Sequence, residues 1–133
     1  MNKEEIMNEM LFEAIEENNI EEVKGLIALG VDIENEQYYY VKDLAKQFWQ
    51  TPVHRAVIHG HTELAIVLIE AGANTSVSHF LLETKYGASI QKEILKIKKE
   101  IQRREESIKA EAKRQKEKAK SQIRKEIQAL KVV

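Results

Sequence analysis

The chain of 133 residues contains no cysteine, one proline and five glycines. The absence of cysteine excludes disulfides, thiolate catalysis and thiolate-ligated metal sites, and it is compatible with a reducing compartment. The sequence also has no glycine-rich phosphate loop, no His-Glu-x-x-His motif and no supported serine, histidine and acid pattern. We therefore expect no enzyme activity, no cofactor and no metal.

Long apolar runs are absent as well. No stretch approaches the roughly 20 apolar residues that cross a bilayer. The first residues, MNKEE, are acidic and lead into an amphipathic segment without the apolar core of a secretory signal. We expect a cytoplasmic protein without membrane insertion, and delivery into a host cell stays open as an alternative.

The formal charge of −1 hides an uneven distribution. Residues 1–87 hold 6 of the 21 Lys and Arg and 15 of the 22 Asp and Glu, whereas residues 88–133 hold 15 and 7. The two segments therefore carry formal charges of −9 and +8. Each can attract a surface of opposite sign, including the other segment of a second copy, and salt weakens this attraction.

One motif stands out in the middle of the chain. Residues 51–61 read TPVHRAVIHGH and residues 63–74 read ELAIVLIEAGAN. This pattern resembles the ankyrin repeat, whose signature begins T-P-L-H-x-A and closes near G-A-D. The resemblance implies a pair of antiparallel helices that stacks on neighbouring pairs and presents side chains to other proteins. It also implies structural roles for His54 and His61, and the spacing of His59 and His61 at a helix end is poor geometry for a metal.

A weaker copy of the unit lies at residues 11–35. Ala14 aligns with Ala56, 42 positions later, and the closing glycines show the same offset. Because an ankyrin period is about 33 residues, about nine extra residues lie in an aromatic insertion at 35–50. Helical spacing, glycine stops and a Thr-Pro start predict the helix pairs. The pairs are 3–17 with 20–29, and 52–59 with 62–71.

A third unit begins at residues 86–89 and then departs from the pattern. From Ala88 to Lys131 there is no glycine or proline, and good helix formers dominate. We predict one continuous helix of about 44 residues, about 65 Å long at 1.5 Å per residue. Since about three repeats are normally needed for a stable stack, its first part should pack on the second unit and the remainder should project.

The long helix carries an apolar stripe with steps of three or four residues. The stripe repeats every 11 residues, and Glu105 and Lys116 occupy two of its positions. An 11-residue repeat predicts a nearly straight or slightly right-handed assembly. Opposite charges favour antiparallel copies, with residues 90–101 of one copy against 123–130 of the other. The predicted self-association residues are Ile97, Ile101, Ile108, Ile123, Ile127 and Leu130.

The sequence thus predicts an all-α fold. A short ankyrin-repeat stack of helix-turn-helix pairs with hairpin loops is followed by one long helix that can form a coiled coil. The predicted domains are an acidic ankyrin-repeat domain at 1–87, with its insertion at 35–50, and a basic helix at 88–133.

Protein-binding candidates come from two places. The resemblance places the family's variable, concave-side positions on both units, although charges there are also typical of any solvated helix face. The insertion contains three consecutive tyrosines, which cannot all hide on one face of a strand, although aromatic residues also fill small cores. The candidates are Arg55, Ile58, His59, Glu13, Glu16, Glu17, Tyr38, Tyr39, Tyr40 and Trp49.

The function that follows is a non-catalytic protein-interaction module, such as a scaffold, an inhibitor or immunity factor, or an effector. Its long helix would self-associate or dock a second protein. Acids interspersed at i,i+3 and i,i+4 favour this over a phosphate-binding helix. The net positive charge keeps nucleic acid or another polyanion as the alternative partner, and a solvated spacer is the third possibility.

Overall fold

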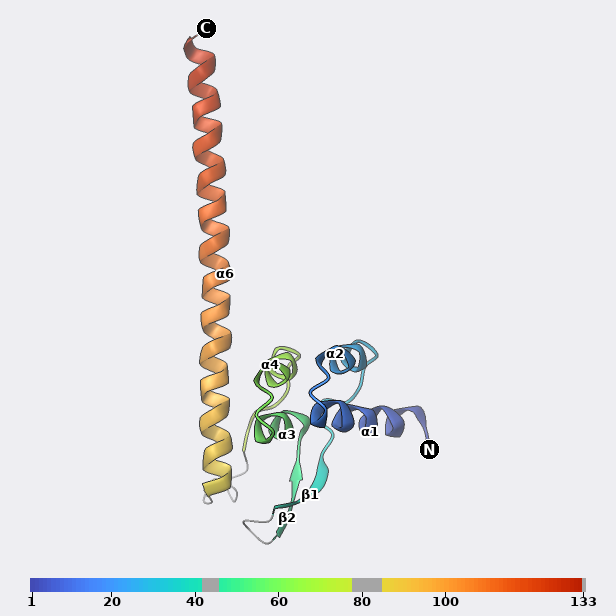
Figure 1. The fold of residues 1–133 in the computed structure, drawn as a ribbon. Coiled ribbons are helices and arrows are strands. Elements are labelled where there is room, and N and C mark those ends of the chain that lie inside the picture. Colours follow the sequence, from blue (N-terminus) through green and yellow to red (C-terminus); the bar gives the residue numbers. More distant parts are fainter. Residues whose placement is uncertain (42–45, 78–84, 133) are drawn as a thin grey trace. The chain divides into compact units, whose positions relative to one another are not determined.

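The computed structural model describes residues 1–41, 46–77 and 85–132. The predicted all-α class is confirmed, with one small two-stranded sheet among the described residues. The predicted helix pairs are also correct, each to within one residue at its ends. In chain order the elements are α1 (Lys3–Glu16), α2 (Ile20–Ala28), β1 (Gln37–Val41), β2 (Lys46–Gln50), α3 (Pro52–Ile58), α4 (Thr62–Glu70) and α6 (Lys85–Val132) (Figure 1).

Local capping explains where the short helices begin and end. Asn2, Asn19 and Thr51 each accept a hydrogen bond from the backbone N–H three residues later, which satisfies a donor that the first helical turn leaves open. Pro52 follows at the first helical position, where its missing N–H costs nothing. Beyond α4, Gly72 has φ +98°, a conformation that other residues rarely adopt.

The two helix pairs stack on each other. Within each pair α1 packs on α2 and α3 on α4, and between the pairs α1 packs on α3 and α2 on α4. Both pairs bury branched apolar side chains in the shared core, so neither pair buries its apolar side alone. The largest fully buried side chains include Leu11, Ile15, Val23, Val53, Leu64 and Leu68.

The predicted insertion contains an antiparallel β-hairpin. Tyr38 lies opposite Trp49, and Tyr39 lies opposite Phe48. Opposite residues share one face of a sheet and successive residues alternate, so these two pairs point to opposite faces. Residues 42–45, between the strands, lie outside the described part of the chain.

Helix α6 has 48 residues and begins three residues before the predicted start. It is long but too highly charged to cross a membrane, and no other described helix combines the needed length and apolar character. The chain divides into two units, Met1–Lys98 and Lys99–Val133, and the helix contributes to both. We call residues 1–98 the body and residues 99–132 the arm.

The first turns of α6 belong to the body. Ile90, Ile94 and Ile97 are all buried there. The antiparallel pairing predicted from charge, with residues 90–101 of one copy against 123–130 of another, requires that these three side chains be free. Their burial in the body conflicts with that pairing and leaves residues farther along the helix as the exposed candidates for self-association.

Candidate functional site

The guanidinium of Arg55 joins four elements of the body. One amino group donates a hydrogen bond to Glu16 Oε1 in α1 at 3.2 Å, and the other donates to Gln50 Oε1 in β2 at 3.2 Å. Its central carbon lies 3.8 Å from the centroid of the Tyr39 ring in β1, which is close enough for a cation–π interaction. Arg55 itself comes from α3, so this one side chain links the hairpin to α1 and α3.

The same chain of contacts reaches α6. Gln50 is buried, and its Nε2 donates a hydrogen bond to the Tyr86 hydroxyl at 2.7 Å. The Tyr86 ring also stacks on Phe48, with centroids 6.5 Å apart. Both ends of the Gln50 amide are therefore satisfied, as a buried amide requires. We call the connected side chains of Glu16, Tyr39, Gln50, Arg55 and Tyr86 the Arg55 network.

Burial and charge determine the ionisation of this network. Burial raises the pKa of Tyr39, and the nearby Glu16 carboxylate raises it further. Burial likewise raises the pKa of Tyr86, although Arg55 acts in the opposite direction. Both phenols therefore stay protonated at neutral pH, which leaves Glu16 and Arg55 as an opposite pair of charges.

Two predicted binding residues are less exposed to solvent than their positions on the helix indicate. The Arg55 side chain is only 17% exposed, because it lies within the network, and Ile58 is half-buried. His59 is exposed and stacks on His61, with ring centroids 5.6 Å apart. Partial burial lowers the pKa of His59, and the charge of Arg55 lowers it further. Of these three residues, His59 is therefore the most exposed.

The end of α1 supplies acidic side chains to the same side of the body. Glu13 and Glu17 are exposed, and Glu16 keeps 43% of its side chain exposed beside Arg55. No cation lies within ion-pair distance of Glu13 or Glu17 among the described residues. The predicted acidic positions thus form a small anionic surface next to the network.

The hairpin has one packed face and one open face. On the packed face, Tyr39 lies 6.0 Å from the ring of Phe12. On the open face, Tyr38 and Trp49 are 53% and 59% exposed, and their rings contact each other with centroids 4.8 Å apart. We call Tyr38 and Trp49 the aromatic pair. Tyr40, the remaining predicted aromatic residue, pairs with Gln47 in the strand register, and its side chain lies outside the description.

The predicted self-association residues fall into three groups. Ile97 is buried in the body and Ile101 is half-buried. The other four are exposed large apolar side chains along the arm: Ile108, Ile123, Ile127 and Leu130.

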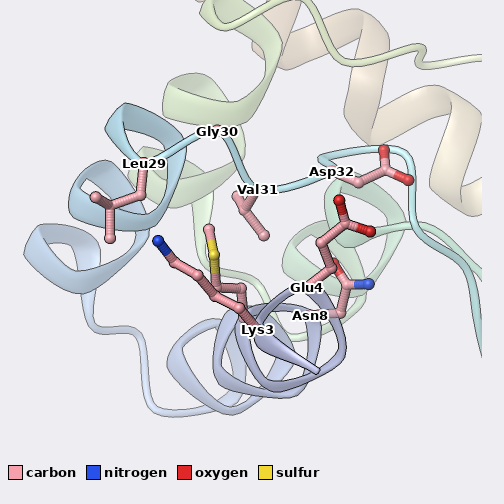
Figure 2. A pocket seen from close by; sticks show the side chains of 8 residues that line it. Lys3, Glu4, Asn8, Leu29, Gly30, Val31 and Asp32 are labelled. Atoms are coloured by element: carbon pink, nitrogen blue, oxygen red, sulfur yellow. The ribbon is translucent and has the colours of Figure 1, made fainter. Parts of the chain in front are cut away.

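A pocket of about 440 Å³ lies at the outer side of the first helix pair. Figure 2 shows Lys3, Glu4 and Asn8 rising from α1 toward the loop that carries Val31 and Asp32. One base and two acids in an open, mixed lining provide no convergent set of groups for catalysis. Within the described residues, no group of three or more histidines and acids can hold a metal ion.

His54 belongs to the core of the second repeat. It is buried, and its backbone N–H donates to Thr51 Oγ1 at 3.3 Å. Burial lowers the pKa of its imidazole, while the backbone of Ser76 and Thr75 acts in the opposite direction. The ring is therefore neutral at pH 7.

Two members of the Arg55 network were not among the sequence candidates. Gln50 directly precedes the Thr-Pro motif, and Tyr86 lies at the degenerate third start. A polar residue before a turn gives no periodic signal, and the partner of Tyr86 lies 36 residues away in the chain. Only the folded hairpin brings the two together.

Comparison with known proteins agrees with the stacked helix pairs of the body. Residues 11–69 match the family described as ankyrin repeats (many copies). The match covers the C-terminal part of α1, all elements from α2 to α3 and nearly all of α4. The resemblance predicted from the sequence is therefore confirmed. No match to the chain is found among curated proteins.

The Arg55 network predicts a stability difference between its two charged members. Arg55→Met keeps most of the aliphatic stem but removes the charged hydrogen bonds, so we expect the free energy of unfolding to fall by about 1.5–3 kcal/mol. Glu16→Gln should cost less than about 1 kcal/mol, because Glu16 is more exposed. Urea unfolding followed by the fluorescence of Trp49, the single tryptophan, measures the body.

Arg103→Met provides the matched control, because Arg103 forms an ion pair that is largely exposed on the arm. Its unfolding curve should coincide with that of the wild type. If Arg55→Met also unfolds like the wild type, the network does not hold the hairpin in place.

Proposed function

Because residues 11–69 contain ankyrin repeats, we propose that this chain is a non-catalytic adaptor that binds another protein through its body and a second copy through its arm. Ankyrin repeats are protein-interaction modules, and this coarser function holds for the repeats themselves. A scaffold, an inhibitor or an effector are all forms that such an adaptor can take.

The aromatic pair is the observation that supports the first part of this proposal, the binding of another protein by the body. Tyrosine and tryptophan are enriched among the residues that dominate binding energy at interfaces. Tyr38 and Trp49 are exposed and contact each other, while Tyr39 on the opposite hairpin face is fixed by Arg55. The pair is thus presented on a supported element, which reduces the entropy lost on binding.

The negative charge of the body indicates which kind of surface its partner presents. Glu13 and Glu17 supply exposed carboxylates at the end of α1, and residues 1–87 carry a formal charge of −9. A partner with an apolar centre and a basic rim therefore fits this surface, and its association should slow as salt increases.

Replacing the aromatic pair tests this surface. In Tyr38→Ser/Trp49→Ser we expect capture of a specific partner from cell extract to fall roughly tenfold or more, because the binding centre is lost. Quantitative mass spectrometry of affinity-captured proteins, compared with the wild type, measures the change.

The control variant is Ile6→Ser/Leu29→Ser, which removes two exposed apolar side chains elsewhere on the body. It should capture the same proteins as the wild type. Equal capture by both variants and the wild type would refute a binding role for the aromatic pair.

The exposed apolar stripe of the arm supports the second half of the proposal. Ile108, Ile123, Ile127 and Leu130 lie on a helix face with Ala112 and Ala119. Exposed apolar side chains that recur along one face are typical of interaction surfaces. We assign the pairing to residues 101–130, because Ile97 is buried in the body.

Two lysines introduced into the stripe should separate the copies. We expect Ile123→Lys/Ile127→Lys to be a monomer of about 15.4 kDa, because charges in an apolar seam are costly to bury. Size-exclusion chromatography with multi-angle light scattering at physiological salt gives the mass.

Ser121→Lys/Gln128→Lys adds the same charge on the opposite side of the helix and should keep the wild-type mass. A wild-type chain that itself elutes at the monomer mass at micromolar concentration would contradict self-association.

A second candidate function is binding of a polyanion by the arm. The observation that favours it is the number of unpaired cations: of nine Lys and Arg at residues 109–131, the described structure pairs two with a carboxylate, Arg114 and Lys120. Unpaired cations on an exposed helix are free to neutralise phosphates.

A further inference from the structure

The arm contains two segments that differ in net charge. Residues 99–106 contain three basic and three acidic residues, so this segment is neutral. Residues 109–125 contain eight basic and two acidic residues, a formal charge of +6. We call residues 99–106 the neutral half and residues 109–125 the basic half, and the positive charge of the arm is concentrated in the basic half.

Ion pairing strengthens this contrast. In the neutral half, Glu100 accepts hydrogen bonds from Arg103 at 2.6 Å and from Arg104 at 3.0 Å, which lower its pKa to about 2. In the basic half, Glu111 pairs with Arg114 at 2.6 Å and Glu117 with Lys120 at 3.5 Å. The two acids of the basic half leave most of its cations without a partner.

Five of these cations form one row along the helix. They are separated by 4, 3, 4 and 4 residues, which places them on one face over about 22 Å. Their side chains are exposed, and among the described residues one of them contacts a carboxylate, at 3.5 Å. We call this row the basic stripe: Lys109, Lys113, Lys116, Lys120 and Arg124.

Such a row is unfavourable for an isolated helix. Like charges at i,i+3 and i,i+4 destabilise a helix, and the basic stripe contains four such steps in succession. The neutral half of the same helix places opposite charges at this spacing, where Glu100 pairs with Arg103 and Arg104. An anionic partner would remove the repulsion.

We infer that the basic stripe binds the phosphate backbone of nucleic acid without reading its bases. This inference rests on the second candidate function and assigns its site. Cations about 6 Å apart along a straight helix match a ligand whose charges also recur regularly, as phosphates do. The neutral half of the arm takes no part in the binding.

A lipid surface fits the basic stripe less well. Helices that lie in a membrane interface insert large apolar or aromatic side chains beside their cations. Alongside most of the basic stripe, the apolar face of the arm offers only Ala112 and Ala119, and Lys116 interrupts it. Little apolar surface would therefore be buried in a bilayer.

Charge-neutral variants of the full-length chain test the inference. Lys113→Gln/Lys116→Gln/Lys120→Gln removes three cations of the basic stripe, and Lys99→Gln/Arg103→Gln/Arg104→Gln removes three from the neutral half. Both lower the net charge equally and keep a good helix former at each position. The probe is a fluorescently labelled 20-base-pair duplex DNA, titrated by anisotropy between 50 and 300 mM salt.

We expect the wild type to bind with a slope of log affinity against log salt of about −4.5, which corresponds to about five neutralised phosphates. The stripe variant should lose about three units of slope and at least tenfold in affinity at roughly 100 mM salt. The neutral-half variant should change affinity by less than about threefold. Circular dichroism should show equal helicity in all three proteins.

Three results would overturn the inference, and they differ in what else they refute. Equal losses in both variants would leave nucleic-acid binding by the arm but refute the basic stripe as its site. No binding of duplex DNA at 50 mM salt would refute the second candidate function as well. Binding to vesicles of anionic phospholipid, without binding to DNA, would assign the stripe to a lipid surface instead.

Discussion

The stacking of α1 on α3 and of α2 on α4 is the constraint on which the rest of the structure depends. Each helix pair has an apolar side that only the other pair covers. The insertion connects the two pairs, so stacking brings its hairpin against α1 and α3. There Arg55 of α3 donates hydrogen bonds to Gln50 of β2 and to Glu16 of α1. We propose that Ile90, Ile94 and Ile97 complete the stack by covering the side that a third repeat would cover.

The division between body and arm separates two kinds of surface. The body presents an aromatic pair, Tyr38 and Trp49, supported from the opposite hairpin face, beside exposed carboxylates. The arm presents long, regular rows instead, one apolar and one basic. A globular partner suits the first surface, whereas a second helix or a repeating polyanion suits the second.

Local signals made the helices predictable from the sequence. The Thr-Pro start, the closing glycines and the lack of helix breakers after Ala88 all act within a few residues. The interior position of Arg55 was not predictable, because helical spacing gives the face of a residue but not the aromatic ring and amide that cover it. Ile97 shows the same limit: its spacing places it in the apolar stripe, but spacing does not indicate whether the body or a second copy buries it.

The most direct test of the account concerns Ile94 and Leu95, which are adjacent on α6 but 3% and 53% exposed. If the first turns of α6 complete the stack, Ile94→Ala should lower the free energy of unfolding of the body by about 2–4 kcal/mol. Leu95→Ala should change it by less than about 1 kcal/mol. Urea unfolding followed by Trp49 fluorescence gives both values, and equal small effects would show that the helix is not part of the folded stack.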